Sequence, residues 1–244
     1  MDPEYRAKYR KLYEQHWWWR AREEIIWGEI RRRLPENSRV DILDIGCGDG
    51  LFFDRLRQFG NVEGVEPAAD LVDPNGANRG RITVAPFDAN FRPGKRYGLI
   101  LMLDVLEHLD APADALNHAV SLLTSEGVLV ATVPAFRLLW TNHDRLNDHR
   151  TRFTKRSFRR LAGCAGMQIL EMRYFYVWLF AVKLGARVAE AILPGEPRAP
   201  QIPSPVVNGL LHWLSCADDL VARHLHVPVG SSLLAIGRRP KNLQ

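Results

Sequence analysis

The sequence predicts an α/β fold built on a doubly wound sheet of seven strands. Short apolar, β-branched runs alternate with helix-length segments, a pattern typical of parallel strands joined by helical crossovers. A glycine-rich turn follows the first of these runs and opens a helical stretch, as in folds of this class that bind nucleosides. In such a sheet, ligands bind at the carboxyl ends of the strands, so the segments after the strands are where a site is expected.

Each element has its own signal. Residues 4–34, rich in Arg, Glu and Trp, predict one helix that ends before Pro35. Segments 176–193 and 206–225 predict amphipathic helices with wide apolar sides, separated by a proline-rich break from Pro194 to Pro205. The expected strands are Val40–Ile45, Asn61–Glu66, Arg81–Pro86, Tyr97–Leu103, Gly127–Val133, Met167–Phe175 and Ser232–Gly237.

The net charge of the chain does not identify its binding partner. The formal net charge is +5, with basic clusters such as Arg31–Arg33 and Lys155–Arg160. This balance suits an anionic partner, such as a membrane surface, a nucleic acid or an acidic substrate. The alternative is that these clusters are solvated faces of helices.

The cysteines and the hydropathy pattern predict a cytoplasmic protein. Cys47, Cys164 and Cys216 are far apart and lack metal-ligand spacing, which favours a reducing compartment over a disulfide scaffold or a zinc site. The chain shows no secretory signal and no apolar run long enough to span a bilayer, so only peripheral membrane contact is compatible with it.

The glycine-rich turn, residues 46–50, has two acidic neighbours that suggest its ligand. Asp44 at the end of the first strand can accept a hydrogen bond from a cationic amino group. Glu66 ends the next strand about twenty residues later, where a carboxylate can accept hydrogen bonds from both ribose hydroxyls. Glycine alternates with other residues and Asp49 is acidic, which disfavours a pyrophosphate. A nucleoside with an amino-acid moiety fits better.

These residues resemble the motifs of class I S-adenosylmethionine-dependent methyltransferases. Asp44–Gly50 resembles the first motif and Gly64–Pro67 the second. Leu101–Leu109 resembles the fourth-strand signature of the branch that contains the ubiquinone-biosynthesis O-methyltransferases. The resemblance covers roughly residues 38–175 and implies a Rossmann-like core with S-adenosylmethionine as cofactor. The cofactor-binding residues it implies are Asp44, Gly46, Cys47, Gly48, Glu66, Pro67, Asp88, Ala89 and Leu103.

The resemblance also sets the expected domain organisation, one domain with two additions. Residues 1–36 form an N-terminal helical cap, and residues 37–175 with 231–240 form the cofactor-binding methyltransferase core. Residues 176–230 form a hydrophobic helical insertion before the last strand, because the core itself needs only a short connection there.

Three side chains after the fourth strand are candidates for chemistry. Methyl transfer from a sulfonium mainly needs alignment and a deprotonated acceptor. Asp104, Glu107 and His108 leave the strand together, and Asp104 and His108 are candidate catalytic residues. In the resembling quinone enzymes, similar residues are implicated in binding a divalent metal, which implies a second cofactor at these three positions. The alternative is that Glu107 and His108 cap and pack the next helix while Asp104 only lines the pocket.

The segment after the fifth strand, residues 134–154, concentrates His, Arg and Asp before a helix expected to be capped by Thr154. His143 and His149 are candidate bases for an acceptor hydroxyl, since histidine titrates near neutral pH. Arg150 and Arg152 could hold an anionic group on the acceptor. Which histidine acts is open at this point.

The tryptophans Trp17–Trp19 cannot all face one core, because consecutive residues point around the whole circumference of a helix. We therefore expect at least one to face the cofactor, a partner or a lipid. In the family the N-terminal helix often covers the cofactor, so Arg20 or Arg22 could pair with its carboxylate, and Arg22 joins the expected cofactor site. The alternative is a structural cap packed on the sheet.

The insertion 176–230 mixes aromatic residues with Lys183 and Arg187, which is typical of interfacial helices. We expect it to lie on a membrane or to enclose an apolar acceptor. The alternative is that its two helices bury each other or a homodimer partner.

Together these observations predict an S-adenosylmethionine-dependent O-methyltransferase that acts on a small or lipid-linked hydroxylated acceptor. One alternative is a non-catalytic cofactor-binding partner subunit, against which the intact Asp44 and Glu66 argue. The other is a nucleic-acid or protein methyltransferase. No nucleic-acid partner is expected, because Leu103–Val105 stands where base-modifying enzymes carry an Asn-Pro-Pro-Tyr type of motif.

Overall fold

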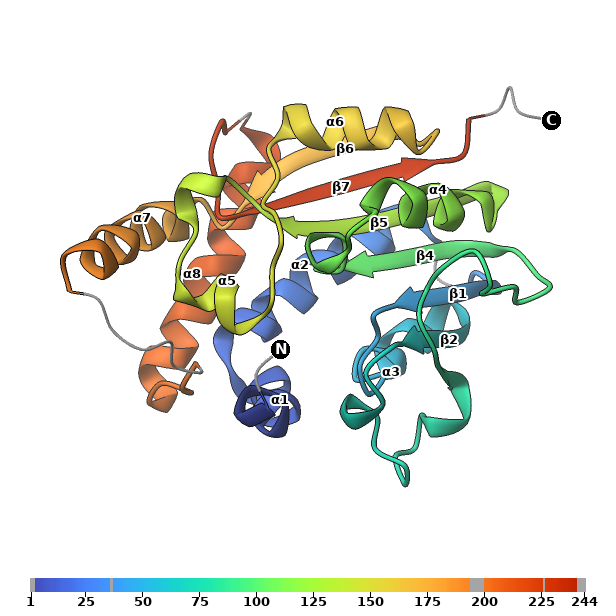
Figure 1. Ribbon diagram of the computed structural model, residues 1–244, viewed down its shortest axis with the longest axis horizontal. Coiled ribbons are helices and arrows are strands. Elements are labelled where there is room, and N and C mark those ends of the chain that lie inside the picture. The colour runs from blue at the N-terminus through green and yellow to red at the C-terminus, as the bar shows by residue number, and fades with distance from the viewer. Residues whose placement is uncertain (1–2, 36, 194–199, 226, 241–244) are drawn as a thin grey trace. The chain divides into compact units, whose positions relative to one another are not determined.

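The computed structural model describes residues 3–35, 37–193, 200–225 and 227–240 (Figure 1). Half of the expected proline-rich break, residues 194–199, therefore lies outside the described residues.

The chain divides into two compact units. Both are assembled from segments that are distant in the sequence, and the N-terminal segment belongs to the same unit as the helices of the insertion. The first unit contains Met1–Arg33, Pro134–Phe153 and Arg173–Leu233, and the second contains Leu34–Val133, Thr154–Met172 and Leu234–Gln244.

The second unit is built on a seven-stranded sheet of order β3-β2-β1-β4-β5-β7-β6. All seven predicted strands are confirmed, although β3 is shorter than expected and β5 begins before the expected Gly127. The ends of β5 and β6 and the start of β7 continue into the first unit. The strands are β1 (Val40–Ile45), β2 (Gly60–Glu66), β3 (Ile82–Val84), β4 (Tyr97–Leu103), β5 (Leu123–Pro134), β6 (Gln168–Phe175) and β7 (Ser232–Arg238).

The strand order reverses at β1, which confirms the doubly wound topology. β1 pairs in parallel with both β2 and β4, so the chain winds outward from β1 in both directions. β7 runs opposite to β5, which makes the sheet mixed (Figure 1). The carboxyl ends of β1 and β4 flank the point of reversal, where doubly wound sheets bind their ligands.

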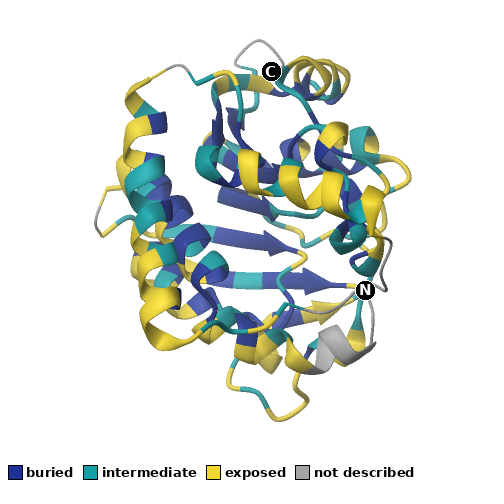
Figure 2. Cartoon of the chain, turned by 90° about the vertical axis from the view of Figure 1, so that its left-hand side faces the viewer, coloured by how far each residue is buried: buried dark blue, intermediate teal, exposed yellow. Residues whose placement is uncertain are grey.

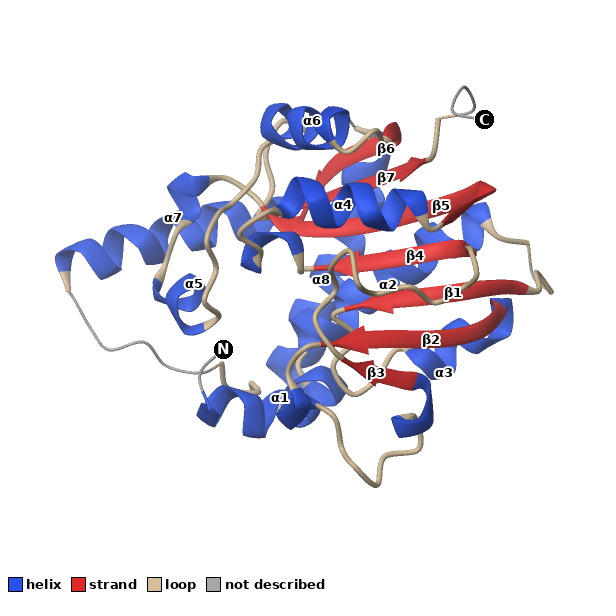
Figure 3. Cartoon of the chain, turned by 45° about the vertical axis from the view of Figure 1, so that its right-hand side comes forward, coloured by secondary structure: helices blue, strands red, loops and turns tan. Residues whose placement is uncertain are grey.

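Helices flank this sheet, and its strands are mostly buried (Figure 2). α4 and α6 pack against each other beside the sheet (Figure 3). Thr154 caps α6 as expected, because its hydroxyl accepts a hydrogen bond from the Ser157 amide at 3.1 Å. The helices of this unit are α3 (Phe53–Leu56), α4 (Pro112–Ser121), α6 (Lys155–Cys164) and the short turns η1 (Arg57–Phe59), η2 (Ala69–Leu71), η3 (Arg79–Arg81) and η4 (Leu106–His108).

The first unit is helical, and its helices include both helices expected in the insertion. At the N-terminus two helices replace the single expected one. Its helices are α1 (Pro3–Gln15), α2 (Trp17–Arg33), η5 (Arg137–Leu139), α5 (Asn142–Leu146), α7 (Val177–Ile192) and α8 (Pro205–His224).

The expectation of one helix over residues 4–34 is wrong, because the chain breaks at His16. The imidazole Nδ1 of His16 accepts a hydrogen bond from the Trp18 amide at 3.1 Å. Asn208 of α8 accepts one from the Trp17 amide at 2.9 Å. In a continuous helix, the Trp17 and Trp18 amides would donate to carbonyls of the preceding turn. Here the two side chains accept these hydrogen bonds instead, and they cap the start of α2.

The three tryptophans are covered within this unit. Trp17 and Trp19 are buried, and Trp18 is half-buried, with the guanidinium of Arg22 5.5 Å from the centre of its ring. The hydroxyl of Tyr176 donates a hydrogen bond to the Trp18 carbonyl. These contacts lie within the first unit, and the predicted contact of Arg22 with the cofactor stays a prediction.

Three aromatic residues at the end of β6 and the start of the insertion are also buried. Tyr174, Phe175 and Tyr176 are at most 5% exposed. Tyr174 packs on Phe136, and Tyr176 packs on Trp18. They cannot be the residues that meet a lipid, because they form part of the unit's core.

Candidate active site

The glycine-rich turn after β1 has the backbone conformation that its glycines predict. Gly46, Gly48 and Gly50 have φ angles of 72°, 54° and 67°. This left-handed region strains residues that have a Cβ atom. At Gly46 a Cβ would also lie only 2.7 Å from the side chain of Val105. The turn therefore depends on glycine for its path.

Glu66 contacts this turn directly. One carboxylate oxygen accepts a hydrogen bond from the Gly48 amide at 2.9 Å, and the other accepts one from the Ala68 amide at 2.8 Å. Parallel pairing of β1 with β2 brings the two strand ends side by side. Both Glu66 and Asp44 are 5% exposed. The structure thus joins the turn and the two acids that the sequence predicted as one site.

Cys47 and Asp49, which lie between the glycines, have structural partners. Burial raises the pKa of the Cys47 thiol far above its ordinary value, and the nearby Asp44 and Glu66 raise it further. The thiol is therefore protonated, and its sulfur fills the space left by the absent side chain of Gly64. The buried carboxylate of Asp49 accepts a hydrogen bond from the Asp73 amide at 3.0 Å, which ties the turn to the segment after β2.

The remaining predicted cofactor residues also belong to the second unit. Pro67 is exposed directly after β2, and Leu103 is half-buried at the end of β4. Asp88 and Ala89 are exposed in the segment between β3 and β4. There the Asp88 carboxylate accepts a hydrogen bond from the Asn90 amide at 2.7 Å and so shapes a turn. Their contacts with the cofactor stay predictions.

Asp104, directly after β4, is held in a strained conformation. Its φ angle is 56°, a value that non-glycine residues rarely adopt and that costs about 1–3 kcal/mol. Its amide donates to the Thr132 carbonyl at 2.9 Å, and the Thr132 hydroxyl donates to its carboxylate at 3.2 Å. Bonds to β5 therefore hold Asp104 in place at the carboxyl edge of the sheet.

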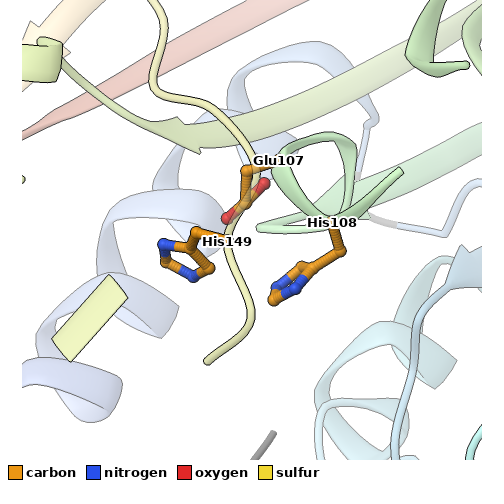
Figure 4. Close-up of side chains that lie close together, drawn as sticks. All are labelled: Glu107, His108 and His149. Atoms are coloured by element: carbon orange, nitrogen blue, oxygen red, sulfur yellow. The ribbon is translucent and has the colours of Figure 1, made fainter. Parts of the chain in front are cut away.

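Glu107 and His108 follow on the turn η4, and His149 belongs to the loop after α5 (Figure 4). Glu107 is fully buried and His108 is half-buried. The metal-ligand set Asp104, Glu107 and His108 stays a prediction.

A buried carboxylate, Asp144, organises the segment after β5 in the first unit. It accepts hydrogen bonds from His149 Nδ1 at 2.8 Å, Arg152 Nε at 2.7 Å and the Thr141 amide at 2.8 Å. Burial alone would raise the pKa of Asp144, but the bonds from His149 and Arg152 hold it well below its ordinary value. Asp144 is therefore ionised, and an ionised carboxylate can only accept.

This arrangement distinguishes the two candidate histidines. Because Asp144 must accept, Nδ1 of His149 carries the proton, and in the neutral ring Nε2 is then the basic nitrogen. His143 differs, since burial and the nearby Lys183 lower its pKa to about 3. A group with so low a pKa is a weak base at neutral pH. His149 has the carboxylate-oriented geometry of a general base, and His143 does not.

The structure shows Arg152 engaged inside the protein, and its predicted contact with an anionic group of the acceptor stays a prediction. Its guanidinium is buried, bonds both oxygens of Asp144 and donates to the Ala135 carbonyl at 2.9 Å. These three bonds are all made to groups of the protein, whereas Arg150 is exposed. Asp144 itself received no role from the sequence, although Thr141 three residues before it has the spacing of a capping box, which the structure contains.

The doubly wound sheet, the glycine turn and the buried acids at the ends of β1 and β2 define a class I S-adenosylmethionine-dependent methyltransferase. Residues 8–172 match the family described as "Methyltransferase domain", and the chain belongs to this family. It is therefore an S-adenosylmethionine-dependent transferase.

The relatives found by sequence share only part of the chain. Over 122 residues it is 26% identical to the mitochondrial ubiquinone biosynthesis O-methyltransferase of Saccharomyces cerevisiae. The match covers 46% of this chain and 39% of the yeast protein. The Candida albicans enzyme of the same name is 26% identical over 135 residues, or 50% of this chain and 41% of that protein. The chain thus spans about two fifths of the length of these curated relatives.

Solved structures share the fold over much more of the chain. The methyltransferase component of a complex with the Haloferax volcanii Trm112 methyltransferase activator aligns with a TM-score of 0.61 at 16% identity, covering 99% of this chain and 96% of that chain. A TehB-like S-adenosylmethionine-dependent methyltransferase of Corynebacterium glutamicum aligns with a TM-score of 0.53 at 16% identity, covering 90% and 88%. At these identities the likeness concerns the fold.

Proposed function

We propose that the protein transfers the methyl group of S-adenosylmethionine to a hydroxyl oxygen of a small or lipid-linked acceptor. The observation that carries this proposal is the buried Asp144, which orients His149 as a base. A hydroxyl is a weak nucleophile until it loses its proton, so an oriented base is what oxygen methylation requires. The partial similarity to O-methyltransferases of ubiquinone biosynthesis supports oxygen as the methylated atom.

The residues of the glycine turn fit the cofactor. When bound, S-adenosylmethionine supplies a methyl group activated by its positively charged sulfur. Asp44 would accept from the cationic amino group and Glu66 from the ribose hydroxyls, since both are buried carboxylates at adjacent strand ends. Gly46, Cys47 and Gly48 would line the methionine moiety through their backbone. We place Pro67, Asp88, Ala89 and Leu103 toward the nucleoside and Arg22 toward the cofactor carboxylate.

Nε2 of His149 would accept the proton of the acceptor hydroxyl, while the methyl group would move from the sulfonium to the acceptor oxygen and the electrons of the S–CH3 bond would remain on sulfur. The imidazolium that forms keeps its Nδ1–H bond to Asp144, whose negative charge stabilises it. Arg152 and the Thr141 amide fix the carboxylate, so the ring cannot rotate away without breaking a buried network. The segment begins directly after the carboxyl end of β5, on the side of such sheets where ligands bind.

The predicted metal would activate the acceptor differently. A divalent ion on Asp104, Glu107 and His108 would lower the pKa of a bound hydroxyl, and His149 would then be unnecessary. A chelator separates the two routes, because it stops a metal-dependent reaction and leaves base catalysis intact.

The proposal is tested with cofactor that carries an isotope-labelled methyl group. Purified protein is incubated with polar and lipid fractions of a cell extract, with and without chelator, and labelled products are identified by mass. We expect label on a hydroxylated compound, retained in chelator and lost with His149→Ala. Label on amines, nucleic acid or protein would overturn the proposed acceptor class, and the absence of any transfer would favour a cofactor-binding partner subunit.

A further inference from the structure

The outward side of α8 is apolar. Val206, Leu210, Trp213 and Leu220 are 82%, 60%, 65% and 58% exposed. They recur every three to seven residues and therefore form one stripe along the helix. Val221 continues the stripe and is also exposed. A continuous apolar patch of this kind on a folded chain marks an interaction surface.

The inward side of α8 is polar, which is why the apolar side faces outward. Asn208 accepts from the Trp17 amide and donates to the Gln15 carbonyl. Asp218 accepts from the Val177 and Trp178 amides at 2.8 and 3.0 Å. If α8 turned to bury its apolar side, each of these bonds would break, and each buried group left unsatisfied costs about 1–3 kcal/mol. The first unit therefore holds the apolar stripe outward.

The adjoining helix α7 also exposes apolar side chains. Val182, Val188 and Ile192 are more than half exposed, and Arg187 is exposed among them. The only acid of α7, Glu190, is half-buried, and its carboxylate accepts from the Asn142 amide at 3.0 Å.

The charges of this surface have one sign. The acids of α8, Asp218 and Asp219, are engaged inward, Asp219 by Arg173 and by Arg223 at 2.8 Å. Among the described residues of α7 and α8, no acidic residue is exposed, whereas Arg187 is. The surface therefore offers hydrocarbon and positive charge, the combination that complements anionic lipid headgroups over an acyl layer.

We propose that the outward side of α8, with the exposed part of α7, lies on an anionic lipid surface. Among the described residues, no helix has both the length and the apolar content to cross a bilayer. An amphipathic helix at the interface is the remaining way for such a stripe to meet lipid. Trp213 in the middle of the stripe has the amphipathic ring that favours the headgroup region. This inference extends the proposed function, since it would present a lipid-linked acceptor to the enzyme.

Flotation of the purified full chain tests the proposal. Vesicles of phosphatidylcholine alone are compared with vesicles that also contain phosphatidylglycerol. We expect the protein to float with the anionic vesicles. The variants Trp213→Glu and Leu210→Glu should each lower the floated fraction at least about tenfold, because each places a carboxylate in the apolar layer. Arg187→Glu should lower flotation on the anionic vesicles only.

The control is Leu170→Glu, which adds the same charge at an exposed leucine of β6 in the other unit and should float like the wild type. Unchanged thermal melting and cofactor affinity show that each variant is folded. Wild-type protein that stays unbound overturns the proposal. A dimer in size-exclusion chromatography that Trp213→Glu converts to monomer, without flotation, would make a second copy the occupant and also overturns it. Flotation needs neither cofactor nor acceptor, so its failure leaves the proposed methyl transfer unaffected.

Discussion

The guanidinium of Arg173 lies 2.8 Å from the carboxylate of Glu29, although the two residues are 144 positions apart. Arg173 also bonds Asp219 of α8, so it links β6 to both α2 and α8. Burial alone would raise the pKa of Glu29, but the bonds from Arg173 and Arg32 lower it to about 2. A fully buried acid thus connects the N-terminal segment with the insertion.

Replacing Glu29 by Gln is expected to lower the free energy of unfolding by about 3 kcal/mol, because it leaves the buried charge of Arg173 with one partner fewer. Urea denaturation measures the change. Glu24→Gln, earlier on the same helix and exposed, is the matched control and should change stability by less than about 0.5 kcal/mol. Equal stabilities of the two variants would show that the buried network contributes nothing.

Glu66→Ala is expected to weaken the binding of S-adenosylmethionine about a hundredfold, the equivalent of about 2–3 kcal/mol, because it removes a charged acceptor for two hydroxyls. Isothermal titration calorimetry measures the affinity. The control Glu63→Gln changes an acid of the same strand that pairs with Lys95, and it should bind the cofactor as the wild type does. Wild-type affinity in Glu66→Ala would mean that the cofactor site has been wrongly assigned.

His149→Ala is expected to lower kcat by about 10²–10⁴-fold without changing cofactor affinity, as the loss of a general base does. His143→Gln should keep most of the activity, because burial already makes that histidine a weak base. Asp144→Asn should lower kcat as well and should also alter the pH profile of kcat, since the orienting charge is gone. The assignment fails if His143→Gln is the slower of the two histidine variants.

Stability should also depend on two histidines whose pKa is lowered in the folded chain. In the folded chain burial lowers the pKa of His16 to about 4 and, together with Lys183, the pKa of His143 to about 3. In the unfolded chain both values are near 6.5. The unfolded state therefore binds more protons below this pH, and the free energy of unfolding falls as the pH drops from about 6.5 toward 4.

Chemical denaturation at a series of pH values measures this slope. The combined variant His16→Asn and His143→Gln should show a flatter dependence, since Asn can still cap α2 but does not titrate. A slope as steep as that of the wild type would assign the pH dependence to other groups.

The features of the fold and of the site that could be predicted from sequence depend on residues that are close together in the chain or on simple strand pairing. The φ angles of Gly46, Gly48 and Gly50 follow from the absence of a Cβ atom, and the cap at Thr154 follows from a hydroxyl next to free amides. The seven strands follow from short apolar runs that a sheet buries on both sides. The proximity of Glu66 to the turn follows from parallel pairing, because adjacent strand ends lie at the same edge.

The predictions that failed depended on partners far away in the chain. The break at His16 depends on Asn208 of α8, and the burial of Tyr176 depends on its packing against Trp18 of α2. No local pattern contains these pairings. A helix propensity of a few tenths of a kcal/mol per residue does not outweigh a buried, satisfied hydrogen bond.

The sequence by itself determined the fold class, the glycine turn with its two acids, and the family. Only the tertiary structure decided that His149 and not His143 has an orienting carboxylate, and that α8 turns its polar stripe inward. Periodicity shows that α8 has two sides, but not which of them is buried. The polar side is buried because Asp219 pairs with Arg173 and Asn208 accepts a hydrogen bond from the Trp17 amide. Without these partners, the buried guanidinium and amide would be left unsatisfied.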